Sequence, residues 1–160
     1  MTEPENMEQH LDAQLEDVIG QLGANMESLF AGASILADEY NQFIRKRNPK
    51  LDWPDKSSLQ LRVRQRGVSM TAEWYQVRWY GSKAKGTRKP FSTYIAKPKT
   101  GYGYTMSKLF IYAQDWEKDK LQDIEARLTA IRRQAKFVMK AIAALKDTVP
   151  DPKRKEGDGV

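Results

Sequence analysis

The sequence predicts an α+β fold in which a small antiparallel three-stranded sheet is inserted between two long helices. Near both ends of the chain, apolar residues recur at steps of three and four, whereas the middle alternates polar and apolar residues. Charge follows the same division. Residues 1–40 contain nine acidic and no basic residues, and residues 41–110 contain sixteen basic and three acidic residues. The middle block is therefore expected to bind a partner of opposite charge.

The first apolar repeat predicts an acidic helix over residues 7–47, after a disordered start at residues 1–6. Leucines recur at every seventh position of this helix, which is typical of a coiled-coil seam. The seam residues are Leu15, Leu22, Leu29 and Leu36. Pro49 and the Trp53-Pro54 pair follow the predicted end of the helix and mark its stop. Several glycines lie inside the repeat and weaken the helix, so it needs a packing partner.

The second repeat predicts a helix over residues 107–147, followed by a disordered tail at residues 148–160. Its seam includes Leu128, Ile131, Val138 and Ile142. The similar lengths favour an antiparallel coiled coil, which would bring the acidic first turns of the first helix beside Arg132 and its basic neighbours. The seams fit an intramolecular hairpin, a homodimer or both. We favour a homodimer, and the alternative is a monomer in which both stripes form the core of an ordinary helix pair.

Residues 48–106 form the predicted basic sheet module. In the first strand, residues 58–66, one face is apolar and the other is cationic. The second strand, residues 72–80, is assigned Tyr75, Val77 and Trp79 in the core, with Trp74, Gln76 and Arg78 on the open face. A basic, glycine-containing loop precedes the third strand, residues 91–97. The order of elements is therefore helix, three strands, helix.

The predicted open face suits the DNA major groove, because Arg pairs bidentately with guanine and Gln with adenine. The predicted base-contacting residues are Gln60, Arg62, Arg64, Gln76 and Arg78. Lysines and arginines around this face would bind phosphates. The predicted phosphate-contacting residues are Arg66, Lys83, Lys85, Arg88, Lys89, Lys97 and Lys99.

Two aromatic residues, Trp74 and Tyr94, are expected among these cations and would stack on unpaired bases. Duplex DNA is the preferred partner, and the alternative is single-stranded DNA or RNA. Both aromatic residues would instead belong to the core if the phase of their strands is shifted by one residue.

Other classes of function find little support in the composition. The chain has no cysteine and a single histidine, His10, which argues against a thiolate or histidine metal site and against a Ser–His–Asp triad. We therefore predict a non-enzymatic protein without metal or cofactor. The chain contains neither an apolar stretch long enough for a membrane span nor a recognisable signal peptide, so we predict a cytoplasmic protein without membrane contact.

Three segments of the basic block resemble MobI-type mobilisation proteins of integrative conjugative elements and related conjugative plasmids. They are residues 74–79 (WYQVRW), 93–97 (TYIAK) and 101–104 (GYGY). The resemblance implies an auxiliary factor that recognises origin-of-transfer DNA and assists a separate relaxase. The acidic helix would then serve assembly or recruit the relaxase or another transfer protein. The alternative is a coiled-coil adaptor or regulatory protein whose basic sheet docks an acidic protein or RNA.

Overall fold

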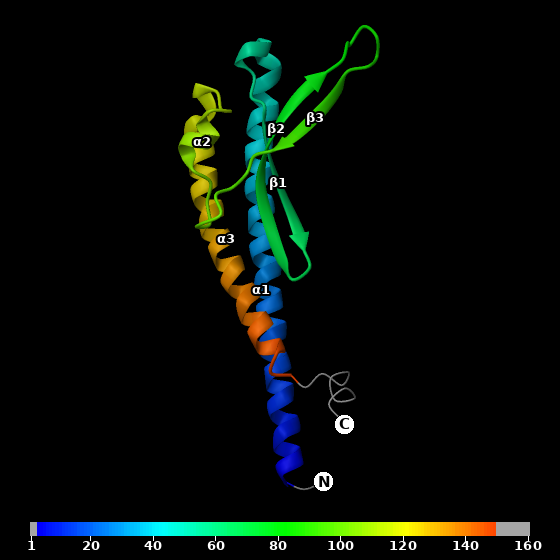
Figure 1. The fold of residues 1–160 in the computed structure, drawn as a ribbon, viewed down its shortest axis with the longest axis vertical. Coiled ribbons are helices and arrows are strands. Elements are labelled where there is room, and N and C mark those ends of the chain that lie inside the picture. Colours follow the sequence, from blue (N-terminus) through cyan, green and yellow to red (C-terminus); the bar gives the residue numbers. More distant parts are fainter. Residues whose placement is uncertain (1–2, 150–160) are drawn as a thin grey trace.

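The computed structural model describes residues 3–149 and confirms the α+β class with a three-stranded antiparallel sheet (Figure 1). The elements are helix α1 (Glu3–Arg47), strands β1 (Leu59–Arg66), β2 (Ser69–Tyr80) and β3 (Lys89–Tyr94), and helices α2 (Met106–Phe110) and α3 (Lys118–Lys146). The strand order is β1-β2-β3. Across residues 3–149, no helix is both long and apolar enough to cross a bilayer.

Helices α1 and α3 pack side by side in opposite directions (Figure 1). Near the end of α1, Lys120 Nζ lies 2.6 Å from Glu39 Oε1, and further toward its N-terminus Gly32 faces Ile131. Of the predicted seam, Leu36, Leu128 and Ile142 are buried, Leu29, Ile131 and Val138 pack against the core, and Leu15 and Leu22 are half-buried. The seams thus meet within one chain. The supercoiling expected of a coiled coil stays a prediction.

The N-terminal part of α1 extends beyond the end of α3 (Figure 1). The helix begins at Glu3, earlier than the expected residue 7, while residues 1–2 and most of the expected tail, residues 150–160, lie outside the described residues. The expected pairing of the acidic first turns with Arg132 was wrong. Its neighbour Ile131 lies against Gly32, about two thirds of the way along α1 from that end. Arg132 itself is buried against the sheet, where it has an internal partner.

The segment predicted as one helix over residues 107–147 is divided. Helix α2 ends at Phe110, and a 3-10 turn over Asp115–Glu117 precedes α3. In that turn, Trp116 Nε1 donates to the carbonyl of Asp55 at 2.8 Å, and Glu117 is fully buried. These contacts attach the turn to the segment between α1 and β1, which a straight helix could not reach.

The helices cover one face of the sheet, with α1 against β1 and α3 against β2. Leu59 and Leu61 of β1 enter the core as predicted, but β2 has the opposite phase from the prediction. Trp74 is fully buried, whereas Trp79 is half exposed. Directly opposed residues of an antiparallel pair share a face, and Leu61 is opposite Trp74. The alternating aromatic residues of β2 fit either phase, and pairing with β1 decides between them.

A buried ion pair between Glu125 and Arg132 joins α3 to the sheet. The guanidinium donates to both carboxylate oxygens, at 2.7 and 2.9 Å, and its Nε donates to the carbonyl of Ala72 at 3.0 Å. The carboxylate also accepts Trp74 Nε1 at 2.9 Å and the backbone N–H of Tyr104 at 3.0 Å. Both charges are therefore satisfied by helix, strand and loop together.

Replacing Arg132 with Met should lower the free energy of unfolding by about 3–5 kcal/mol, because it leaves Glu125 buried without its partner. Urea unfolding followed by circular dichroism measures the loss. Arg133→Met is the matched control, since Arg133 is the next residue of α3 and is exposed. Equal losses in the two variants would contradict the structural role of the pair.

A second buried carboxylate, Glu117, holds the start of α3 against α1. Its Oε1 accepts the hydroxyls of Tyr40 at 3.1 Å and Ser57 at 3.0 Å. Its Oε2 is buried and has no hydrogen-bond partner among residues 3–149. Burial raises the pKa of the Glu117 carboxyl, because the hydrogen bonds only partly offset the cost of removing the charge from water.

Glu117 should therefore make the protein less stable as pH rises. Because the folded-state pKa lies above the ordinary value of 4.5, its stabilising contribution is complete below pH 4.5 and is lost as pH rises through the folded-state pKa. The side chain of Glu117→Gln cannot titrate. The urea concentration at its unfolding midpoint should therefore rise relative to that of the wild type as the pH is raised from 4 to 7 (roughly the interval that brackets a raised carboxyl pKa). Glu27→Gln, on the exposed surface of α1, is the control. A pH-independent difference between Glu117→Gln and the wild type would contradict the expectation.

Candidate nucleic-acid interface

The face of the sheet opposite the helices carries an ordered arginine. The guanidinium of Arg62 lies 4.3 Å over the ring of Tyr75 and donates to Gln60 Oε1 at 3.0 and 3.2 Å. It also donates to Ser92 Oγ on β3. Arg62 is thus held by all three strands while remaining partly exposed. Such a preorganised guanidinium loses little side-chain entropy when it binds a planar acceptor.

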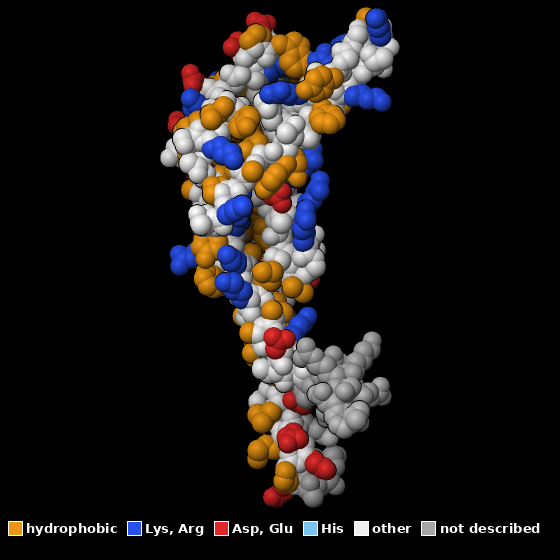
Figure 2. All heavy atoms as spheres, viewed as in Figure 1, with side chains coloured by type: hydrophobic (Ala, Val, Ile, Leu, Met, Phe, Trp, Pro, Cys, Tyr) orange, Lys and Arg blue, Asp and Glu red, His pale blue; other side chains and the backbone are white. Residues whose placement is uncertain are grey.

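This open face is positively charged along β1. Arg64 and Arg66 are exposed beyond Arg62, and Glu73 is the one acidic residue in the three strands. Figure 2 shows Lys and Arg side chains along the sheet, and acidic side chains on the N-terminal part of α1. The charge division expected from the sequence is therefore also a division in space.

The five predicted base-contacting residues do not share one face, so the expectation of a common face was wrong. Gln60, Arg62 and Arg64 lie on the open face, whereas the reversed phase of β2 places Gln76 and Arg78 on the opposite side. Gln76 is half-buried opposite Leu59, and Arg78 is exposed near the end of β2.

The ends of β2 and β3 project from the body as a hairpin, residues 78–91, which we call the arm (Figure 1). Lys83, Lys85 and Lys89 are exposed on it, as expected for phosphate contacts. Gly81 closes its loop with φ +87°, and a Cβ at this position would lie 2.3 Å from the carbonyl oxygen of Thr87. Only glycine fits there.

The remaining phosphate candidates lie in different surroundings. Lys99 is exposed, whereas Lys97 is half-buried. Burial, followed by repulsion from Arg132, lowers the pKa of Lys97. Arg88 is half-buried because it lies over tryptophan rings. The predicted cations are thus spread over the open face, the arm and the loop that follows β3.

The two predicted stacking residues have opposite outcomes. Trp74 was wrongly placed on the surface, because it is fully buried, with its ring edge-on to Tyr40 at 4.8 Å and its Nε1 bonded to Glu125. Tyr94 is 48 % exposed on β3, beside Tyr75 on the open face. Its exposure agrees with the prediction, and stacking stays a prediction.

Sequence reasoning missed Trp53, which is 55 % exposed in the 3-10 turn Trp53–Asp55. The Trp-Pro pair was interpreted only as a signal that the first helix has ended. Its nearness to Lys50 and Lys56 in the sequence could have marked an exposed aromatic residue among cations.

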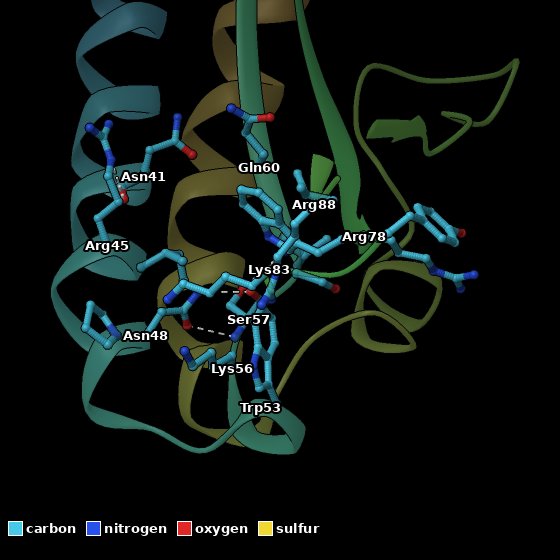
Figure 3. A pocket seen from close by; sticks show the side chains of 17 residues that line it. Asn41, Arg45, Asn48, Trp53, Lys56, Ser57, Gln60, Arg78, Lys83 and Arg88 are labelled. Carbon is cyan, nitrogen blue, oxygen red and sulfur yellow. Dashed lines mark hydrogen bonds between the residues drawn. The ribbon is translucent and has the colours of Figure 1, made fainter. Parts of the chain in front are cut away.

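Trp53 lines a groove of about 1240 Å³ between the end of α1, the segment before β1 and the start of the arm (Figure 3). Five basic side chains line it: Arg45, Lys56, Arg78, Lys83 and Arg88. None of its lining residues is acidic. Gln60 also lines the groove, so the groove adjoins the open face of the sheet.

These features define a small α+β protein that carries a basic sheet and a basic arm on a pair of antiparallel helices. A family model described as MobI protein matches residues 29–146. The chain therefore belongs to the MobI family, which confirms the resemblance seen in the sequence and indicates a role in conjugative mobilisation. Residues 1–28, the most acidic part of α1, lie outside the match. No curated protein and no solved structure matches the chain.

Proposed function

We propose that the protein is a non-enzymatic auxiliary factor that binds duplex DNA at the origin of transfer and assists a separate relaxase. The observation that carries this proposal is the ordered Arg62 on an open sheet face, with Arg64 and Arg66 beside it. Membership of the MobI family supports the biological setting.

The open face supplies both kinds of contact that a duplex reader needs. Nε and Nη2 of Arg62 already donate to Gln60 and Ser92, so Nη1 is the nitrogen that can donate to an acceptor on the major-groove edge of guanine. Arg64 and Arg66 along β1, and the lysines of the arm, suit phosphate contacts that add salt-dependent affinity. Gln76 is not part of this proposal, because it faces the other side of the sheet.

The N-terminal part of α1 is the proposed site of protein contact. It carries Glu8, Asp12 and Glu16 without a basic residue among them, which favours a basic surface on the relaxase or another transfer protein. A different side of the same segment exposes Met7, Leu11 and Val18, spaced as on one helical face. This apolar stripe lies beside the line of the seam, whose preceding positions are Asp12 and Glu8, and we propose that it forms the contact of a homodimer.

Replacing Arg62 and Arg64 together with Ala should weaken binding to an origin-of-transfer duplex by about tenfold or more at fixed salt, because a base contact and a neighbouring cation are lost. Fluorescence anisotropy over a salt titration measures this. The control, Arg133→Ala with Lys146→Ala, removes the same charge from α3, where both residues are exposed.

Equal weakening in both double variants would reduce the effect to net charge and contradict the assigned face. Failure of the wild type to bind any duplex near physiological salt would overturn the proposal and favour the adaptor, whose basic sheet docks an acidic protein or RNA.

The proposed homodimer predicts a sedimentation mass of twice 18.4 kDa. Met7→Gln with Leu11→Gln should reduce this to the mass of one chain, because these side chains are 64 % and 55 % exposed in the single chain and would be covered in the dimer. Ile35→Gln, at another exposed apolar position of α1, is the control. A single-chain mass for the wild type would contradict the dimer.

A further inference from the structure

The groove beside the arm has unbalanced positive charge. Arg45, Lys56, Arg78, Lys83 and Arg88 line it, and none of the five has an acidic side chain within salt-bridge distance among residues 3–149. Among residues 3–149, the basic residues with an acidic partner all lie on α3, namely Lys118, Lys120, Arg127 and Arg132. An anionic ligand is therefore the natural counter-charge for this groove.

Indole rings are placed among these cations. The guanidinium of Arg88 lies 4.4 Å from the ring centre of Trp53 and 5.5 Å from that of Trp79, and Lys56 Nζ lies 4.6 Å from the ring centre of Trp53. Both indoles are nevertheless half exposed. Cations that bind phosphates beside aromatic rings that stack on bases are the shared features of sites for unpaired nucleic acid.

The walls of the groove are already formed. Asn48 both donates to and accepts from the backbone of Ser57, at 3.0 and 2.8 Å. Asn41 makes the same paired contact with the backbone of Leu61, at 2.9 and 3.2 Å. These two amides fasten the end of α1 to the approach and start of β1 (Figure 3). A ligand therefore meets a preorganised surface and does not have to order it.

The size and chemistry of the groove favour a strand over other anions. Its volume of about 1240 Å³ exceeds the roughly 300–1,000 Å³ of pockets that enclose one small ligand. A duplex hides the faces of its bases inside the stack, so it cannot offer them to Trp53 or Trp79. An unpaired strand offers base faces and phosphates together.

The groove lies next to the proposed duplex-binding face of the sheet. Gln60 lines the groove and also accepts the hydrogen bonds of Arg62. A strand that leaves a duplex bound over Arg62 would reach the groove by passing this one residue. The two surfaces are thus contiguous. Trp79 alternates with Tyr75 along β2 and lies where they meet, whereas Trp53 belongs to the groove alone.

We infer that the groove binds a short stretch of unpaired DNA, so that the protein holds a junction between duplex and melted strands. This inference rests on the proposed DNA-binding function and adds the substrate class to it. Trp53 is the stacking residue, and Arg78, Lys83 and Arg88 bind the phosphates of the unpaired strand.

Fluorescence anisotropy of the full chain with three labelled DNAs of one sequence tests the inference. The probes are a duplex, the same duplex with a central bubble of about six unpaired bases, which is within the size range of single-strand sites, and one strand alone. The wild type should bind the bubble more tightly than the duplex. Trp53→Ala should weaken bubble binding by about tenfold, as expected for loss of one stacked base, and leave duplex binding within about twofold, the usual scatter for non-contacting positions.

Two further variants make the result specific. Trp53→Phe keeps an aromatic ring and should retain most of the preference for the bubble. Phe137→Ala removes a similarly exposed aromatic ring that also lies beneath a lysine, on α3 and outside the groove. It should change neither affinity.

The outcomes separate the two proposals. Tight duplex binding without any gain from the bubble, or an equal effect of Trp53→Ala on both probes, overturns the groove assignment and leaves the duplex face standing. Binding of the bubble and the single strand without duplex binding, lost in Trp53→Ala, supports the groove and overturns the duplex face. Binding of no probe overturns both.

Discussion

The arrangement of this protein depends on the buried ion pair between Glu125 and Arg132. These residues lie two turns apart on α3, and their polar atoms also bind β2 and the loop that precedes α2. Removing either member of the pair would leave the other charge unpaired in the core, so the pair holds helix, strand and loop in a single arrangement. Gly103 shows how closely they fit, because a Cβ there would lie 2.4 Å from Thr129 Oγ1 and 3.3 Å from Glu125 Oε2.

That constraint determines which surface is available for function. Because Trp74 is tied to Glu125, its side of β2 is buried and Tyr75 faces outward, where it supports Arg62. The end of β2 projects from the body of the molecule and forms the arm together with β3 (Figure 1). Glu117 and the amides of Asn41 and Asn48 attach the end of α1 to the start of α3, to β1 and to the segment before β1, and so fix the wall of the groove that α1 forms. The open face and the groove are therefore built on two buried polar networks, and cations without internal partners gather on them.

Particular residues show where sequence reasoning succeeded and where it did not. In β1, only one phase puts the apolar side chains together, so Leu59 and Leu61 were assigned correctly and Arg62 and Arg64 with them. In β2, aromatic residues occupy both faces, and alternation could not identify the buried one. The sequence places Arg132 among the surface charges of its helix. Its carboxylate partner, Glu125, is seven residues away, which is not the spacing of three or four residues by which an ion pair on a helix is recognised. The local sequence around Trp53 indicates only the end of a helix, because the groove that Trp53 lines is assembled from segments distant in sequence.

The sequence by itself determined the α+β class with a three-stranded antiparallel sheet between helical regions, the separation of acidic from basic regions and the family. These are properties of periodicity, composition and local motifs, which are written in neighbouring residues. The tertiary structure alone decided which face of β2 is buried, where the second long helix begins, and which cations and aromatic residues meet in one groove. Each of these features depends on contacts between residues far apart in the chain. The free energies that decide them come from burying a charge or an indole together with its partners, and not from local conformational preference.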